Sequence, residues 1–182
     1  SLTSNVDPAF LAQVLTLPGE TWLAEQMTVV DVDGIHAARR FVQQMLAERL
    51  RAPLRTVYET LHDRENTGYR IDALAIGQRA LKNVCLDYLM QLDEPTERAL
   101  ALKQFHSADN MTDQLGALAP LANCEGPERT EALAAFYDRW RDEPLVVDKW
   151  LTLQATSRLR GALGIVQQLM AHEAFNLRNP NK

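Results

Sequence analysis

The stretch HEAFN, residues 172–176, contains residue types that could do metal chemistry. In the helical zinc-protease signature His-Glu-x-x-His, two histidines one turn apart bind Zn²⁺ and the glutamate acts as the base. Here Asn176 occupies the position of the second histidine, and an amide is not among the usual zinc ligands. The motif also lies close to Asn179-Pro180, where a helix should end. We therefore expect His172 to meet the last carbonyl groups of a helix, Phe175 to pack inward, and no metal to bind.

Other residues capable of chemistry are dispersed along the sequence. None of His36, His62 and His106 is paired with a second His, Cys or acidic residue at zinc-ligand spacing. Cys85 lies on the apolar side of an expected helix, where a thiol more often belongs to the core than to catalysis. The sequence has no Gly-x-Ser-x-Gly elbow, and GALG at 161–164 lies inside a helical pattern, so it is not a phosphate-binding loop. The pattern predicts no catalytic residue and no metal ligand, and it leaves substrate-binding residues unknown.

The cysteine content indicates a reducing compartment. Cys85 and Cys124 are the only two cysteines, and both lie in apolar helical patterns. Two such thiols do not make a disulfide framework, so we expect buried free cysteines. The first residues, SLTSNVDPAF, show no basic region followed by an apolar core, as a secretory signal would. The expected location is the cytoplasm.

Large and acidic side chains near helix starts have structural explanations. Trp150 is spaced for core packing, whereas residues 148–149 should lie on the wetter side of the same helix. The acidic pairs Asp31 with Asp33, and 93–94, precede helices, where they can cap the first turn or complement the helix dipole. None of these residues forms a paired-carboxylate site.

The composition excludes several classes of function. Of the 182 residues, 46% are hydrophobic and 24% are charged, as in an ordinary soluble domain. The formal net charge is −5 and the pI is about 5.4, without a basic stripe. Such a chain is a poor binder of nucleic acid or of an anionic membrane surface. No apolar run approaches the roughly 20 residues of a transmembrane helix.

The segments that position the residues discussed above all have sequence patterns typical of helices. Helical periodicity or helix-start signals mark ten segments, at 7–15, 17–27, 31–50, 53–61, 72–92, 95–108, 109–123, 127–140, 144–156 and 158–172. The third segment has an apolar stripe of Ile35, Ala38, Val42, Met45 and Leu46. The fifth has the stripe Leu74, Leu81, Val84, Cys85, Tyr88 and Leu89.

The expected helix starts carry capping residues. Asp7 precedes Pro8, which suits the first helical position. Asp33 is the expected cap of the third segment, and Ser157 that of the last. Asn110, with Asp113 three residues later, forms a variant of the capping box. The expected fourth helix begins at Pro53.

Helices of 8–20 residues joined by tight breaks predict an all-α fold. No segment alternates as a strand does, and the only β-like patch, MTVVDV at 27–32, is too short to outweigh the rest. Short connections favour antiparallel pairs, which form either a compact bundle or an α-solenoid of armadillo or HEAT type. No clean repeat is visible, so a solenoid would be irregular. We treat residues 1–182 as a single helical domain.

Several motifs, in one order, resemble the C-terminal domain of the aminopeptidase N family, which comprises bacterial zinc-dependent alanyl aminopeptidases. The matching stretches are LPGETWLAEQMTVVDVDGIHAARRFV (17–42), YRIDALAIGQRALKNVCLDYL (69–89), KQFHSADNMTDQLGAL (103–118), FYDRWRDEPLVVDKWLTLQATS (136–157) and HEAFNLRNPNK (172–182). The resemblance covers nearly the whole chain. It implies an irregular armadillo-like, superhelical solenoid.

The resemblance also implies a role without catalysis. In that family a separate upstream domain carries His-Glu-x-x-His, a distant glutamate and a Gly-Ala-Met-Glu-Asn motif, none of which occurs here. The helical domain closes over that catalytic domain, so the implied partners are the rest of the enzyme and its peptide substrates. The implied cofactor is zinc in the parent enzyme, with none in this chain. A start without methionine and an end at NPNK fit a piece of a longer protein.

Two other functions remain to be compared with this one. The chain could be a stand-alone α-solenoid that binds a protein partner in a groove. It could also be an autonomous metallohydrolase that uses His172 and Glu173, although the missing ligands argue against this.

Overall fold

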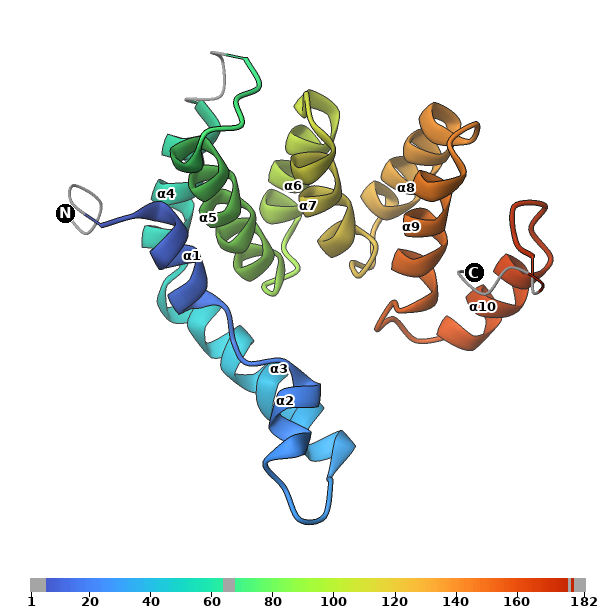
Figure 1. The fold of residues 1–182 in the computed structure, drawn as a ribbon, viewed down its shortest axis with the longest axis horizontal. Helices are drawn as coiled ribbons and strands as arrows, with labels where there is room; N and C mark the ends of the chain where they lie inside the picture. Colours follow the sequence, from blue (N-terminus) through green and yellow to red (C-terminus); the bar gives the residue numbers. More distant parts are fainter. Residues whose placement is uncertain (1–5, 64–67, 177, 179–182) are drawn as a thin grey trace.

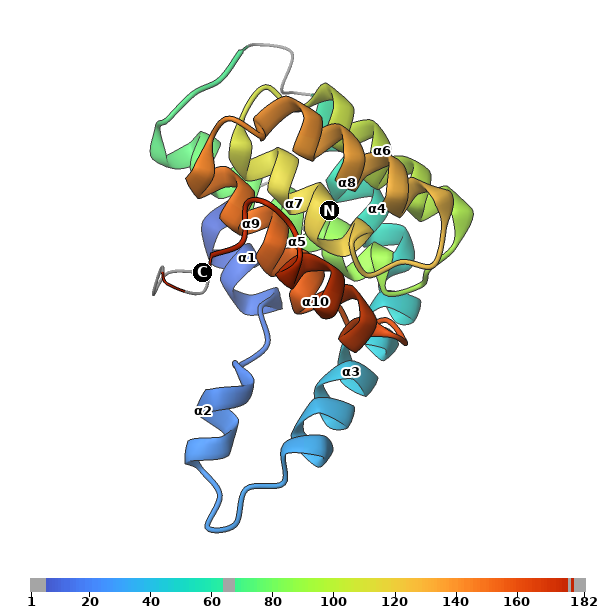
Figure 2. The ribbon, with the colours of Figure 1, turned by 90° about the vertical axis from the view of Figure 1, so that its right-hand side faces the viewer.

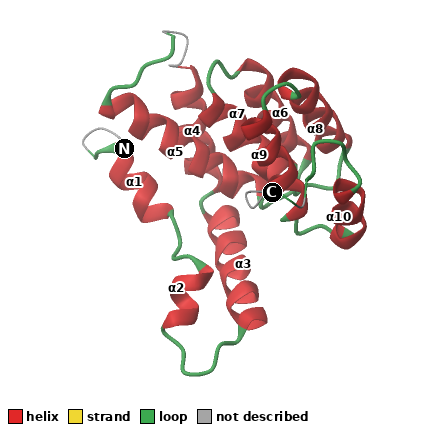
Figure 3. Cartoon of the chain, turned by 45° about the vertical axis from the view of Figure 1, so that its right-hand side comes forward, coloured by secondary structure: helices red, strands yellow, loops and turns green. Residues whose placement is uncertain are grey.

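The computed structural model describes residues 6–63, 68–176 and 178. Throughout that part of the chain the regular elements are α-helices (Figure 3). They are α1 Pro8–Leu15, α2 Glu20–Glu25, α3 Val32–Arg49, α4 Arg51–Asp63, α5 Ala73–Met90, α6 Pro95–Ser107, α7 Met111–Leu121, α8 Pro127–Trp140, α9 Pro144–Ala155 and α10 Ala162–Met170. The predicted all-α class is confirmed. None of the helices described is long and apolar enough to cross a membrane.

Helices α4 to α9 form three antiparallel pairs that stack side by side (Figure 1). Within each pair the two helices pack directly, and contacts of α5 with α7 and of α6 with α8 join one pair to the next. One layer therefore consists of α4, α6 and α8, and the other of α5, α7 and α9. α1 packs on α5, and α10 turns away to pack on α9. This is the predicted irregular α-solenoid.

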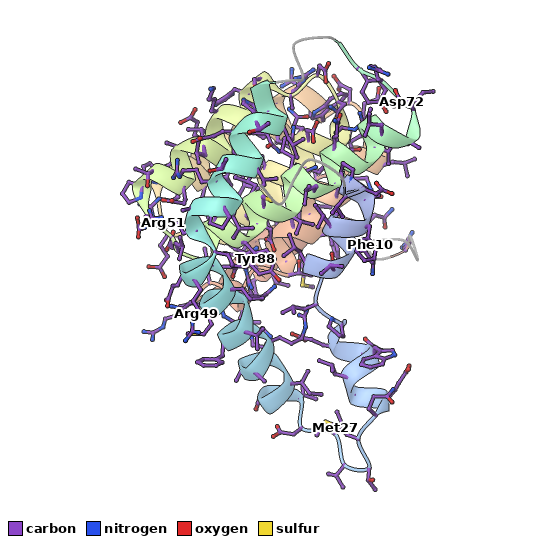
Figure 4. All side chains as sticks on the ribbon, turned by 90° about the vertical axis from the view of Figure 1, so that its left-hand side faces the viewer. Phe10, Met27, Arg49, Arg51, Asp72 and Tyr88 are labelled. Carbon is purple, nitrogen blue, oxygen red and sulfur yellow. The ribbon has the colours of Figure 1, made fainter. Side chains whose placement is uncertain are left out.

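Helices α2 and α3 form an arm that projects from the solenoid (Figure 2). Met27 lies at its tip, whereas Arg49 and Arg51 lie at its base (Figure 4). α3 passes into α4 with a single-residue break at Leu50. Pro53 explains the break, because it has no N–H to donate to the preceding turn and its ring crowds the carbonyl of residue 49. The predicted start of this helix at Pro53 is wrong by two residues, since proline is tolerated inside a first turn.

Most of the predicted helix starts are confirmed. The carboxylate of Asp7 accepts a hydrogen bond of 2.9 Å from the amide of Ala9, with Pro8 at the first position. The side chain of Asn110 accepts one of 3.0 Å from the amide of Asp113. α6, α8 and α9 each begin at a proline. The sequence rules for caps therefore locate these ends correctly.

Two predicted caps are wrong. Asp31, and not Asp33, accepts the hydrogen bond of 2.9 Å from Gly34 and caps α3. Ser157 does not cap α10, which begins five residues later with Gly161 at its N-cap. The hydroxyl of Ser157 instead donates to the carbonyl oxygen of Ala122 at 3.1 Å, so it ties the end of α9 to the end of α7.

The main core lies between the two layers of the solenoid. It contains buried side chains of α4 to α8, among them Leu54, Tyr58, Leu81, Cys85, Leu86, Leu89, Phe105, Leu118, Leu121, Leu133 and Phe136. A smaller cluster of Val147, Leu151 and Leu169 joins α10 to α9. The predicted stripe of α5 is buried or half-buried except Leu74, in the first turn of the helix, which is 55% exposed.

The buried carboxylate of Glu97 on α6 forms ion pairs with α4, and we call these contacts the brace. The Glu97 side chain is fully buried and accepts hydrogen bonds from Arg51 at 2.9 Å and Arg55 at 2.7 Å. Thr96 also donates to it. Burial alone would raise the pKa of Glu97, but Thr96 and the two arginines outweigh that effect and lower it.

We expect acid to weaken this brace. A folded-state pKa below the value of about 4.3 in an unfolded chain means that ionised Glu97 stabilises the fold above that pH. The contribution is then lost as the pH falls through the lower folded-state pKa. Glu97→Gln should cost about 1.5–3 kcal/mol at pH 7, and the difference from wild type should shrink towards pH 3. Urea unfolding across this range checks it; a difference that is constant with pH would contradict the account.

Candidate functional site

The HEAFN stretch lies in turns that follow α10 and not on a helix. Two ligands four residues apart therefore do not share a helical face here. The side chain of Asn176 accepts a hydrogen bond of 3.0 Å from the amide of Arg178. Phe175 is half-buried. The geometry of the helical zinc signature is absent from these residues.

His172 closes a small aromatic cluster. Its ring lies 5.0 Å from that of Tyr137 and 5.3 Å from that of Trp150, measured between centroids. Nδ1 accepts a hydrogen bond of 3.1 Å from the amide of Ala174, and Tyr137 donates to Glu173 at 3.2 Å. The prediction that the His172 side chain meets the last helical carbonyls is wrong, although its amide does donate to Leu169 O at 3.0 Å. The cluster holds the turn after α10 against α8 and α9.

The other histidines have separate surroundings. His36 lies 3.0 Å from a carboxylate oxygen of Glu20, and His106 lies 2.8 Å from one of Glu131. His62 stacks on Tyr58. Among the residues described, no three His, Cys, Asp or Glu side chains form a group that could hold a metal ion.

Cys85 and Cys124 are buried free thiols, as predicted. Burial raises the pKa of Cys85 to about 12 and also raises that of Cys124. A thiol nucleophile needs the opposite shift, because only the thiolate attacks.

We expect both thiols to be inert in the folded chain. A thiol-specific reagent such as Ellman's reagent should react at least roughly a hundredfold more slowly with the native chain than with the chain in urea, because reaction requires opening of the core. The release of the reagent's chromophore measures the rate. Rapid modification of one thiol in the folded state would contradict the burial.

The acidic pairs and Trp150 have structural roles. Asp93 accepts hydrogen bonds from Arg98 through both its carbonyl and its side chain. Glu94 lies at the N-cap of α6, where its charge can complement the helix dipole, but its side chain makes no capping hydrogen bond and pairs with Arg51 instead. Trp150 packs against both apolar clusters, and its indole donates to Leu133 O at 2.9 Å.

Residues 148–149 divide between surface and interior. Lys149 is exposed, as predicted, whereas Asp148 is half-buried. The prediction of a wetter side is therefore correct for the lysine alone.

A cluster of hydrogen-bonded polar side chains lies in the interior of the solenoid, and the sequence patterns did not predict it. The Lys82 ammonium lies 3.2 Å from Oδ2 of Asp113, and both side chains are essentially inaccessible to water. Asn83 donates to Oδ1 of Asp113 at 2.9 Å, and Asn110 donates to Oδ2 at 2.7 Å. Gln104 donates to both Asn83 Oδ1 and the Asp113 carbonyl oxygen. We call Lys82, Asn83, Gln104, Asn110 and Asp113 the polar node.

The polar node joins α5, α6 and α7 at one point. An ion pair removed from water is stable only when hydrogen bonds satisfy its remaining polar atoms, and here amide side chains from each helix do so. Gly116 packs closely against the polar node. A Cβ atom at this position would lie only 2.6 Å from the Asn83 side chain. Asp113 was recognisable as part of the capping box, but its burial depends on α5, which the local sequence does not encode.

Two open hollows lie in the corner between the arm and the C-terminal ends of α5 and α7, and a smaller one, of about 140 Å³, lies between α1, α4 and α5. One, of about 380 Å³, is lined by residues that include Leu15, Arg39, Asn83, Asp87 and Pro120. A second, of about 330 Å³, is lined by residues that include His36, Arg40, Asn123 and Arg158. Five separate segments of the sequence therefore meet in this corner.

The corner carries charges of both signs. Burial raises the pKa of Asp87, and the charges of Arg158 and Arg39 partly oppose that rise. Arg158 is exposed, but partial desolvation still lowers its pKa. The positive charge of nearby Arg40 lowers this pKa further. Arg39 donates to Pro18 O at 2.7 Å. Such a surface can contact polar groups of a peptide or protein, but it contains no activated nucleophile.

The fold and this surface define an armadillo-type α-solenoid without a recognisable catalytic centre in its described part. The chain belongs to the family described as "Domain of unknown function (DUF3458_C) ARM repeats", whose model matches residues 2–182. This confirms the solenoid architecture.

Known proteins similar to this chain are aminopeptidases. It is 35% identical over its whole length to aminopeptidase N of Escherichia coli and covers 20% of that protein. It is 40% identical to aminopeptidase N of Haemophilus influenzae, over 93% of this chain and 19% of that protein. It is also similar to a crystal structure of Legionella pneumophila aminopeptidase A in complex with aspartic acid. That likeness has a TM-score of 0.81 and 29% identity, over 99% of this chain and 22% of the other.

The resemblance to the C-terminal helical domain of the aminopeptidase N family is thereby confirmed. The chain spans about a fifth of the length of the curated relatives that it matches. It therefore corresponds to one part of those aminopeptidases.

Proposed function

We propose that this chain is the non-catalytic helical cap of a zinc-dependent aminopeptidase that removes N-terminal residues from peptides. The observation that carries the proposal is the match of the whole chain to one fifth of aminopeptidase N. The remaining four fifths of such a protein supply the catalytic domain, which is the first partner of this chain. Peptide substrates are the second, and the cytoplasm is the proposed location, in keeping with two free buried thiols.

The proposed contribution of the cap is enclosure. A rigid stack of helix pairs forms a wall that excludes folded proteins from a reaction chamber and admits short peptides. The braces at Glu97 and at the polar node keep neighbouring pairs at fixed angles, which a wall requires. The corner between arm and solenoid presents polar and charged groups on an open surface, as a wall in contact with peptides would.

The zinc ion of the proposed enzyme belongs to the catalytic domain. The described residues include no group of three His, Cys, Asp or Glu side chains that fits such an ion, and Nδ1 of His172 is already hydrogen bonded. The ring of His172 also lies against Tyr137 and Trp150. When bound in the catalytic domain, zinc would activate the attacking water.

The test compares this chain with the full-length protein that contains it. The full-length protein should hydrolyse an alanyl anilide and contain stoichiometric zinc by elemental analysis. The isolated chain should fold as an α-protein, bind no stoichiometric zinc and release no product. His172→Ala with Glu173→Ala in the full-length protein should leave its zinc content unchanged. A full-length protein without peptidase activity would favour a stand-alone binding module, and loss of zinc in the double variant would favour a metal site here.

A further inference from the structure

Helix α3 carries an apolar face, in the middle of its length, that the described structure leaves largely open. Ile35, near the start of the helix, is buried, and Ala47, near the end and on the opposite side of the helix, is buried in the main core. Between these two positions lie Ala38, Phe41, Val42 and Met45, spaced i, i+3, i+4 and i+7 along one face. We call these four residues the α3 face.

The α3 face is largely exposed, whereas the apolar face of an amphipathic helix normally packs against a neighbouring element. Phe41 is 65% exposed, Val42 is 40% exposed and Ala38 is also exposed, whereas Met45 is half-buried. α2 does not cover the face, because its contact with α3 is made through Glu20 to His36 and Arg39, on another side of the helix. An amphipathic helix gains stability by burying such a stripe, and small Ala38 lets a second helix approach closely.

The surroundings of the α3 face resemble the edge of a protein interface. Gln44 and Glu48 are exposed and hydrogen bonded to each other at 3.2 Å, and Arg49 is exposed at the far end. An apolar centre with a charged rim is typical of a surface that docks a partner. The relatives contain about four times as many further residues as this chain, so a covering segment is available within one polypeptide.

We propose that the α3 face docks an amphipathic helix from the part of the aminopeptidase polypeptide that lies outside residues 1–182. The inference rests on the proposed function, because it places this chain inside a longer enzyme. The arm, which α3 joins to the solenoid through a single-residue break, is held in place by this contact. A second copy of this chain is the competing occupant.

Hydrogen exchange with mass spectrometry compares the isolated chain with the full-length protein. Amides of residues 38–45 should exchange at least about tenfold more slowly in the full-length protein, because a docked helix suppresses local opening. In the full-length protein, Phe41→Gln should return this segment to the rate of the isolated chain. The matched control Leu145→Gln alters another exposed apolar side chain, on α9, and should leave exchange at 38–45 unchanged.

Three results would overturn the docking proposal. One is equal exchange of residues 38–45 in the two proteins. A second is a Phe41→Gln variant whose isolated chain loses its fold, which would make Phe41 part of this chain's own core. A third is concentration-dependent protection in the isolated chain, which would identify a second copy as the occupant. If the full-length protein protects the α3 face but has no peptidase activity, the docking proposal stands. Only the proposed function is then contradicted.

Discussion

Replacing Asp113 with alanine should lower the free energy of unfolding by about 3–5 kcal/mol. The substitution leaves the Lys82 ammonium where water does not reach, without the carboxylate that it faces at 3.2 Å. The side-chain amides of Asn83 and Asn110 lose an acceptor in the same step. Because folded domains are stable by only about 5–15 kcal/mol, the variant should be substantially unfolded near 37 °C. Urea unfolding followed by circular dichroism measures the change.

The control for this prediction is Asp138→Ala. Asp138 carries the same charge on α8 and is exposed, so its loss should change the free energy of unfolding by less than about 0.5 kcal/mol. Replacing the pair together, as Lys82→Met with Asp113→Leu, should cost less than Asp113→Ala, since it buries no lone charge. Equal small effects of Asp113→Ala and Asp138→Ala would show that the polar node does not stabilise the solenoid.

Phe136→Ala should have an effect of similar size, about 3–5 kcal/mol, for a different reason. Phe136 of α8 is fully buried, and its ring lies 6.5 Å from that of Phe105 and 6.4 Å from that of Trp140. Truncation leaves a cavity between the second and third helix pairs, where stacked repeats derive stability from their shared interface. The thermal midpoint and the urea midpoint should both fall.

Leu163→Ala provides the comparison for Phe136→Ala. Leu163 is an apolar side chain that is 72% exposed on α10, so its truncation should change stability by less than about 0.5 kcal/mol. A loss below about 1 kcal/mol for Phe136→Ala would mean that the space closes by repacking, and that the interface between the pairs is not rigid.

Local sequence rules predicted the helices well because their starts are encoded locally. Proline at the first position and a polar cap such as Asp7 or Asn110 act within one turn, so the residues nearby suffice. Asp31 and Asp33 satisfy the same rule equally, but only Asp31 lies where its side chain accepts the hydrogen bond from Gly34. Ser157 was misassigned because α10 begins only at Ala162, and the hydroxyl of Ser157 donates to the distant carbonyl group of Ala122.

The arrangement of helices and the functional surface could not be predicted from residue patterns. The sequence pattern placed Ala38 and Val42 on the apolar stripe of α3, but the pattern does not say that both are exposed in this chain. The burial of Lys82 and Asp113 depends on three helices that meet, and a lysine in a helical pattern otherwise indicates a solvated surface. The family resemblance supplied the solenoid architecture, which periodicity alone left open against a compact bundle.

The central claim is that these residues form part of an aminopeptidase, and the mass of the native polypeptide tests it most directly. The source cells should be fractionated by size, and each fraction assayed for alanyl aminopeptidase activity and for tryptic peptides of residues 69–89 and 136–157. A chain of 20.5 kDa that represents a fifth of its relatives predicts a polypeptide of about five times that mass, near 100 kDa, co-eluting with activity. Peptides confined to a 20 kDa protein without activity would contradict the account.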